Sequence, residues 1–222
     1  MIDPQTIAFP LLLTDCSAPG VRAGILTEKG WKAYTRLEGE TGATLFEAVK
    51  QLLQRTNLDL DQLKSFAYCE GPGSTLGIRI NSMALRTWNS LFDSPKPIYA
   101  YRSLVAARYL VEELGKADDS FSMLSDLRKN SWNGLRVETN EPKQEVQTVS
   151  ADDIDTWPSP RFFIQQRIHS PGSPAGSEII DYDLESLGTH QGFLASFTQV
   201  EKPEVFQTTT TEFKKWTPTR HR

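Results

Sequence analysis

The chain has 222 residues, 38% of them hydrophobic and 23% charged, with a formal net charge of −4. This length suits one large domain or two smaller lobes, and the acidic balance excludes a general basic surface for nucleic acid. Apolar runs fall short of the roughly 18 residues of a membrane span, and no signal peptide precedes Leu11, so we expect a cytoplasmic protein.

The chain opens with a strand pattern. Residues 11–15 form a continuous apolar run, typical of a strand buried on both faces, with Asp15 at its end. Residues 21–27 and 31–37 flank Lys29-Gly30, which predicts a β-hairpin. Such a strand would bury Cys16, and a second apolar run would bury Cys69, so we expect two structural thiols.

The next segment is helical by its apolar spacing. Residues 44–55 place leucine and valine along one face, Thr44 and Glu47 have the spacing of a capping box, and Asn57 ends the pattern. A short strand at residues 66–69 follows.

A glycine loop then joins that strand to a second helix. Gly71, Gly73 and Gly77 permit unusual backbone conformations and close approach of another group. Ser74 or Thr75 can accept hydrogen bonds from the free amides of the helix start. The segment is therefore either an anion site at a helix N-terminus or a tight connection without a ligand.

Known loop chemistries match this segment poorly. Gly77 is followed by Ile78 and Arg79, so the lysine of a P-loop is missing, and the neighbours of Ser74 do not form a Gly-x-Ser-x-Gly elbow. The glycine spacing approaches a dinucleotide fingerprint but lacks the acidic strand end about 20 residues on. A weak nucleotide-loop signal remains.

The helix after the loop spans residues 75–92. One side carries Ile80, Ala84, Trp88 and Leu91, whereas the other side carries Arg79, Ser82, Arg86 and Asn89. A strand at 98–101 and a helix from Ser103 to residue 114 complete a βαβα alternation, which predicts a mixed sheet with helices on its faces. A lobe boundary is expected between residues 101 and 120.

The second half is less regular, and no internal sequence repeat is visible in the chain. We expect a hairpin at residues 121–138, a polar loop at 140–147 and a short helix at 150–157. A strand is expected at 161–168, a loop rich in proline and glycine at 170–176, and a weak helix at 183–197. The basic end, with Lys214, Lys215, Arg220, His221 and Arg222, is expected to be a solvated tail or a contact to a partner or tRNA.

The glycine loop resembles a family signature. Residues 71–80 are similar to the Gly-Pro-Gly-Ser-Phe-Thr-Gly-Leu-Arg-Ile motif of the TsaB (YeaZ-like) family, with Thr75-Leu76 in place of Phe-Thr. Further similarity lies in the opening strand, at residues 11–17, and in a segment before the loop, at 59–63. It continues after the loop, at 103–104 and 126–136, and near the end of the chain, at 203–206 and 213–216. The match covers residues 10–136 and the last twenty, and is faint between.

The resemblance implies an α/β fold of two actin-like (ASKHA, RNase H-like) lobes, each a mixed sheet flanked by helices, at residues 1–101 and 102–222. It also implies a degenerate nucleotide loop formed by Asp15, Gly71, Gly73, Ser74, Gly77 and Arg79. Asp15 would face a phosphate or its metal in such a fold, although an aspartate at a strand end is more often a turn or cap residue.

By the same resemblance, the chain is a non-catalytic scaffold. Families similar to TsaB bind a TsaD-type protein, which transfers a threonylcarbamoyl group to an adenosine of tRNA. We therefore expect a homodimer without cofactor or membrane contact that meets tRNA only through the complex. The implied interface lies on the helices at 44–55 and 75–92, with Leu45, Phe46, Val49, Leu53, Met83 and Trp88.

An alternative class is a nucleotide-dependent ATPase or small-molecule kinase of the same superfamily. It needs acidic groups that hold a metal opposite the loop, and Asp15 alone is well placed. The three histidines are scattered without metal-ligand spacing, unlike the histidine pair of TsaD-type proteins, and no nucleophile–base pair suggests a peptidase. Two departures from the family lie near the implied interface and cleft: the region 42–44 replaces a usual histidine, and the loop has Thr-Leu.

Overall fold

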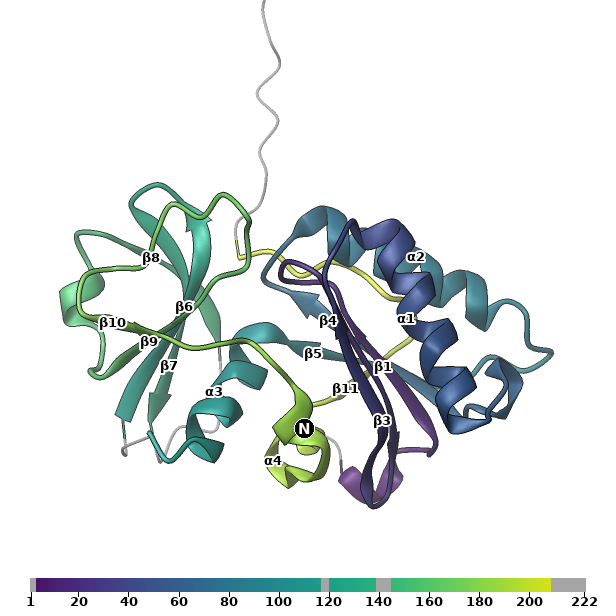
Figure 1. The fold of residues 1–222 in the computed structure, drawn as a ribbon. Helices are drawn as coiled ribbons and strands as arrows, with labels where there is room; N and C mark the ends of the chain where they lie inside the picture. Colours follow the sequence, from purple (N-terminus) through teal and green to yellow (C-terminus); the bar gives the residue numbers. More distant parts are fainter. Residues whose placement is uncertain (1–2, 117–119, 139–144, 209–222) are drawn as a thin grey trace, which may run out of the picture.

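Two β-sheets lie side by side in the computed structural model, which describes residues 3–116, 120–138 and 145–208 (Figure 1). The first sheet has the order β11 (Thr198–Val200), β5 (Ile98–Arg102), β4 (Ser65–Gly71), β1 (Leu11–Asp15), β2 (Val21–Thr27) and β3 (Gly30–Leu37). The second has the order β10 (Ser177–Ile179), β9 (Arg161–Ile164), β6 (Ser120–Arg128), β7 (Ser131–Glu138) and β8 (Val146–Ser150).

The two sheets repeat one strand pattern. In the first, β1 pairs antiparallel with β2 and parallel with β4, and β3 and β5 extend the two sides. In the second, β6 pairs antiparallel with β7 and parallel with β9, and β8 and β10 extend it in the same way. The chain is therefore a structural duplication, which its sequence does not display.

Strand β1 is fully buried, as its continuous apolar run predicts, because both faces of the first sheet are covered. Helices α1 (Thr41–Thr56) and α2 (Thr75–Asn89) cover one face, and α3 (Ser103–Glu113) and α4 (Gln191–Ala195) lie on the other, toward the second sheet (Figure 1). The core around α3 is shared by the two sheets and includes Leu13, Tyr101 and Met123.

The predicted helix starts need correction. Helix α1 begins at Thr41, before the supposed capping box, because the Glu40 carboxylate accepts hydrogen bonds from the amides of Gly42 and Ala43. Its end is as predicted, with Asn57 in the left-handed conformation at φ 52°. Ser103 is the first residue of α3 rather than its cap, and its hydroxyl donates to the carbonyl oxygen of Pro72 at 2.6 Å.

Helix α2 also differs from the expected pattern. It ends at Asn89 rather than residue 92, and Leu91, expected on the same side as Trp88, is exposed whereas Trp88 is buried. Ser82, expected on the polar side, is buried and returns a hydrogen bond to the carbonyl oxygen of Ile78. A serine hydroxyl that donates a hydrogen bond within its own helix can be buried at low cost. The polarity of Ser82 therefore did not indicate which face of α2 is exposed.

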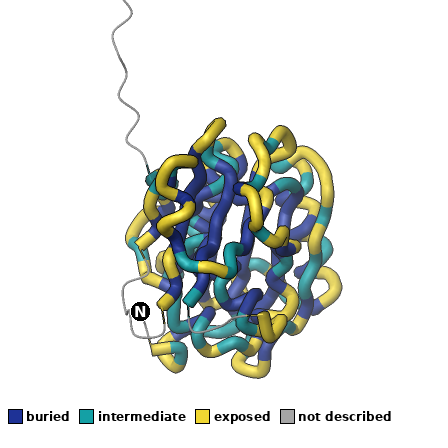
Figure 2. Tube along the Cα trace, turned by 90° about the vertical axis from the view of Figure 1, so that its left-hand side faces the viewer, coloured by how far each residue is buried: buried dark blue, intermediate teal, exposed yellow. Residues whose placement is uncertain are grey.

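The second sheet has less helix around it than the first. Its outer face is covered by Ile154 from the 3₁₀ segment η3 (Ile154–Thr156) and by the following residue, Trp157, which cluster with Trp132. Figure 2, viewed from this side of the molecule, shows buried strands with exposed turns around them. The helix predicted at 150–157 is therefore the end of β8 followed by this single turn.

Other boundaries in the second half are also shorter than predicted. The strand expected at 161–168 ends at Ile164, and the helix expected at 183–197 is η4 (Glu185–Thr189) followed by α4. The hairpin formed by β6 and β7 and the loop at 170–176 are confirmed. Most of the polar loop at 140–147 and the basic end of the chain lie outside the described residues.

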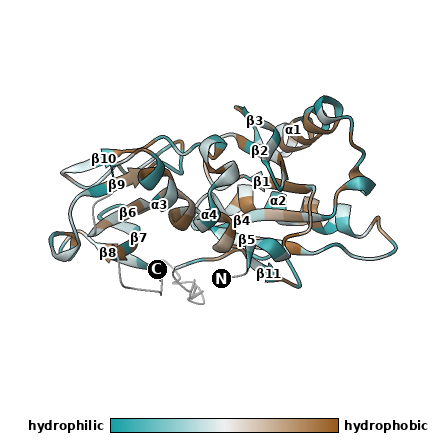
Figure 3. Cartoon of the chain, turned by 90° about the horizontal axis from the view of Figure 1, so that it is seen from below, coloured by the Kyte–Doolittle hydropathy of each residue, from teal (hydrophilic) through white to brown (hydrophobic). Residues whose placement is uncertain are grey.

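The chain returns to the first sheet after it has built the second. Strand β11 pairs antiparallel with β5, so the segment 102–222 is not confined to the second sheet (Figure 3). Beyond β11, the Tyr68 hydroxyl both accepts from the amide of Glu204 and donates to its carbonyl oxygen, and the Phe206 amide donates to the Glu70 carbonyl oxygen.

The segment that leads from β10 to η4 joins the two halves. The buried Arg22 side chain donates to the carbonyl oxygens of Tyr182 and Pro19. The Tyr34 hydroxyl donates to Asp183 Oδ1 at 2.6 Å and accepts from the Leu184 amide at 3.1 Å. These contacts fix the halves against each other.

No helix in the part of the chain that the structure describes is both long enough and apolar enough to cross a membrane.

We predict that Tyr34→Phe lowers the free energy of unfolding by about 1–3 kcal/mol, because the Asp183 carboxylate and the Leu184 amide each lose a partner. Chemical denaturation measures the change. Tyr109→Phe is the matched control, because this buried ring packs on His190 and no hydrogen bond of its hydroxyl is recorded among the described residues. Equal stability of the two variants would contradict the role given to Tyr34.

Candidate functional site

The glycine loop connects β4 to α2 at the end of the first sheet that faces the second half. Gly71 has a φ of 124°, the peptide between Gly71 and Pro72 is cis, and Ser74 is the N-cap of α2. The Ser74 hydroxyl accepts from the Gly77 amide at 3.2 Å, as the sequence predicts.

The loop packs backbone to backbone on the turn after β1. The Ser74 amide donates to the Ser17 carbonyl oxygen at 2.8 Å. A Cβ atom on Gly73 would collide with that carbonyl, and one on Gly77 would collide with the Cys16 carbonyl oxygen. Two of the three loop glycines are therefore required by the close approach of the chain's own backbone.

The third glycine, Gly71, lies against the segment that follows β11. A Cβ atom on Gly71 would lie 2.8 Å from the carbonyl oxygen of Phe206, whose ring stacks under the Arg102 guanidinium. Thus each loop glycine has a structural partner in the chain, which supports the tight-connection interpretation of this motif.

Asp15 is the most enclosed of the predicted loop residues. Its Oδ1 atom accepts from the Ser17 amide at 2.7 Å, and its Oδ2 atom accepts from the hydroxyls of Tyr101 and Tyr182, each at 2.7 Å. Burial, followed by the nearby Asp15 charge, raises the pKa of both tyrosines well above the ordinary value, so they remain donors at every physiological pH.

The carboxylate thus has both oxygens engaged and is 0% exposed. In this arrangement it does not fit the role of a metal or phosphate contact. Within residues 3–116, 120–138 and 145–208, no group of three or more histidine, cysteine, aspartate or glutamate side chains is placed to hold a metal ion.

A groove of about 540 Å³ lies beside the loop, and we call it the loop groove. Gly73, Ser74 and Gly77 line one wall, and Gln166 to His169 line the other. Of the other predicted loop residues, Asp15 and Gly71 are buried, and Arg79 is exposed on α2; none of these three lines the groove. The predicted nucleotide set is therefore split between a buried cluster, a groove wall and an open helix face.

The predicted interface residues also divide. Leu45, Val49 and Trp88 are buried in the core beneath α1 and α2, whereas Phe46 and Met83 are 53% and 66% exposed. Leu53 is half-buried. The Phe46 ring meets the Trp88 indole edge-on, with 5.8 Å between ring centroids, so one exposed and one buried aromatic form a continuous surface.

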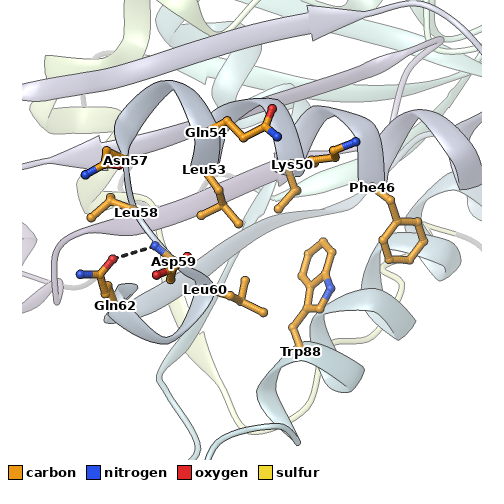
Figure 4. A pocket seen from close by; sticks show the side chains of 11 residues that line it. Phe46, Lys50, Leu53, Gln54, Asn57, Leu58, Asp59, Leu60, Gln62 and Trp88 are labelled. Atoms are coloured by element: carbon orange, nitrogen blue, oxygen red, sulfur yellow. Dashed lines mark hydrogen bonds between the residues drawn. The ribbon is translucent and has the colours of Figure 1, made fainter.

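A second groove, of about 600 Å³, lies between α1, α2 and the 3₁₀ segment η2 (Leu60–Gln62). Figure 4 shows Leu53, Leu60 and Trp88 directed toward it, with Lys50 and Gln54 at its rim. Exposed apolar residues that sequence reasoning missed are Leu76, at 70%, and Leu91, at 68%. The spacing of Leu76, Ile80 and Met83 along one helix face could have indicated the first of these.

Both cysteines are free and buried, as expected. Burial raises the pKa of the Cys16 and Cys69 thiols far above the usual range, which leaves them unreactive.

Comparison with known proteins places the fold in a recognisable class. No protein-family model and no curated protein sequence matches the chain. Among solved structures, YeaZ from Pseudomonas aeruginosa is similar, with 17% identity, a TM-score of 0.65, and coverage of 89% of this chain and 98% of that one. A protein described as uncharacterised, with similarity to peptidase YEAZ from the same organism, gives 17% identity, a TM-score of 0.64, and coverage of 88% and 98%.

The chain therefore has the fold of YeaZ, with two mixed sheets flanked by helices, and this agrees with the mixed α/β fold predicted from the sequence. Its resemblance to YeaZ is confirmed at the level of the fold.

We predict that Gly73→Val lowers the free energy of unfolding by about 1–3 kcal/mol, because the side chain displaces the Ser17 backbone. Thermal and chemical denaturation measure the effect. Gly42→Ala is the control, since its Cβ would approach only the flexible carboxylate of Glu40, at 3.2 Å. An unchanged melting temperature for Gly73→Val would show that the loop does not depend on this approach.

Proposed function

We propose that the chain is a non-catalytic binding subunit that engages a TsaD-type protein through the outer surface of α1 and α2. In this proposal it supports threonylcarbamoyladenosine modification of tRNA, and tRNA is reached through the complex. The single observation that carries the proposal is the apolar surface of these two helices.

That surface concentrates exposed apolar side chains. Of the seven large hydrophobic residues described as exposed, Phe46, Leu76, Met83 and Leu91 lie on or directly after α1 and α2. A concentration of exposed apolar side chains of this kind marks an interaction site more often than chance exposure. The adjoining groove offers a concave floor into which a partner side chain can insert.

The second sheet does not cover these helices. Figure 1 shows α1 and α2 on the face of the first sheet that points away from the second sheet. Among the described residues, Phe46, Leu76, Met83 and Leu91 remain exposed, and a second chain is their natural partner. Because a helix pair readily packs on another helix pair, self-association through the same surface is part of the proposal.

The alternative, a nucleotide-dependent ATPase or kinase, has the loop groove as its supporting observation. Against it stand the engaged oxygens of Asp15 and the packing of the glycine loop on the Ser17 backbone. Nucleotide hydrolysis of this kind needs bound metal and mobile lobes, and the described contacts between the halves oppose such motion.

We predict that Phe46→Glu together with Met83→Glu shifts the chain from dimer to monomer and weakens capture of a TsaD-type partner by about tenfold or more, because charges would be buried at the contact. Light scattering and a quantitative binding assay measure the two effects. Both side chains are exposed, so circular dichroism should stay native.

Ile168→Glu is the matched control, since Ile168 is 77% exposed and lies outside α1 and α2. If the double variant retains both the dimer mass and the partner affinity, the proposed interface is wrong. If the control alone weakens capture, the partner uses the loop groove instead.

The ATPase alternative has its own test. We expect the purified chain to lack ATP turnover. We also expect Asp15→Asn to lower stability, because an amide nitrogen cannot accept a hydrogen bond and at least one of the three donors loses its acceptor. Robust hydrolysis that Asp15→Asn abolishes, with the melting temperature preserved, would favour the enzyme over the scaffold.

A further inference from the structure

A third groove lies on the opposite side of the first sheet from α1 and α2. It has a volume of about 610 Å³, and its apolar floor comes from α3 and the strand β10: Leu110, Leu114, Ile179 and Ile180. Leu114 is 57% exposed and Ile179 is 65% exposed, so this floor is open. Asp181, Asp183 and Glu185 line its edge, and we call it the acidic groove.

Carboxylates outnumber cations around this groove. Asp181 and Asp183 both pair with Arg36, and Lys116 pairs with Glu178, while Glu185 adds further negative charge. An occupant that complements the groove must therefore carry apolar side chains flanked by positive charge.

The chain itself contains a segment of that composition. Residues 209–222, which lie outside the described part, include Phe213 and Trp216 with Lys214-Lys215 between them, and Arg220 and Arg222 follow. Glu212 is the segment's only acidic residue. Two aromatic side chains and a basic pair match an apolar floor with an acidic edge.

The segment begins within reach of the groove. The hydroxyl of Thr208, the last described residue, donates to the Asn133 side chain at 2.8 Å. The neighbouring Gly134 lies in register with Leu124, then Phe163, then Ile179, at the floor of the groove. Three strand spacings amount to about 15 Å, whereas eight residues from Thr208 to Trp216 span up to about 27 Å.

Charge distinguishes this groove from the other two. Arg167 and His169 line the loop groove together with one carboxylate, Glu40, so its lining has no excess of negative charge. The groove beside Trp88 is lined by one positive and one negative side chain, Lys50 and Asp59, whose charges cancel. A basic segment therefore has its best electrostatic match in the acidic groove.

We propose that residues 209–222 dock in the acidic groove of their own chain, with Phe213 and Trp216 on the floor formed by Leu114 and Ile179. Lys214 and Lys215 then face the carboxylates of Asp183 and Glu185. This contact is independent of the α1–α2 surface and of any partner that binds there.

Disulfide trapping in the full-length chain tests the proposal. Ser186→Cys places a thiol at the groove edge, and Thr217→Cys places one beside Trp216; the native thiols are buried and do not compete. We expect the intrachain disulfide to form at least about fivefold faster than in a control that pairs Thr217→Cys with Thr75→Cys in the loop groove. Mass spectrometry of the digested, non-reduced protein identifies the bond.

Two further variants separate docking from random collision. Phe213→Ser with Trp216→Ser should reduce the trapping rate to that of the control. Glu185→Lys should slow trapping, and Lys215→Glu in the same chain should restore part of the rate. Equal rates for both thiol pairs, a rate unaffected by the aromatic substitutions, or disulfides formed only between two chains would overturn the proposal.

Discussion

The structure depends on one buried carboxylate. Asp15 ends the central strand of the first sheet, and its three donors come from the following turn, from β5 and from the segment after β10. A buried charge without partners costs several kcal/mol. The two tyrosine hydroxyls and the Ser17 amide are therefore needed to compensate the burial of the Asp15 carboxylate. Because the donors are far apart in the sequence, the carboxylate holds the two halves of the chain at one point.

This arrangement engages Asp15 within the protein itself. The Asp15 carboxylate accepts hydrogen bonds from the protein rather than facing a ligand. The glycine loop likewise makes its close contact with the Ser17 backbone. The loop groove remains, but its walls are held by hydrogen bonds such as that from Gln166 Nε2 to the Pro72 carbonyl oxygen, at 2.7 Å. For the proposed binding subunit, such rigidity would mean that the binding surface needs no reordering.

Local patterns predicted the first half well. The buried run of β1, the hairpin of β2 and β3, the N-cap Ser74 and the turn at Asn57 each follow from a few neighbouring residues. The start of α1 was missed because Glu40, an uncommon N-cap residue, satisfies the amides of the first turn. The second half was harder to predict, since its sheet repeats the first with the 3₁₀ turn η3 in place of α1 and a loop in place of α2, so no helical spacing marks the repeat. The roles of Asp15 and the glycines could not be derived, because their partners lie up to 167 residues away.

The return of β11 to the first sheet has a consequence for how the protein is made. Until residues 198–200 leave the ribosome, β5 is an edge strand with an unpaired side. Tyr182 likewise reaches Asp15 only when most of the chain is complete. Synthesis from the N-terminus therefore produces a nascent first lobe that lacks its last strand, β11. In this nascent lobe the Asp15 carboxylate also lacks one of its hydrogen-bond donors. Folding to the final state has to wait for the end of translation, and a chain truncated before residue 198 leaves an exposed strand available for pairing with other molecules.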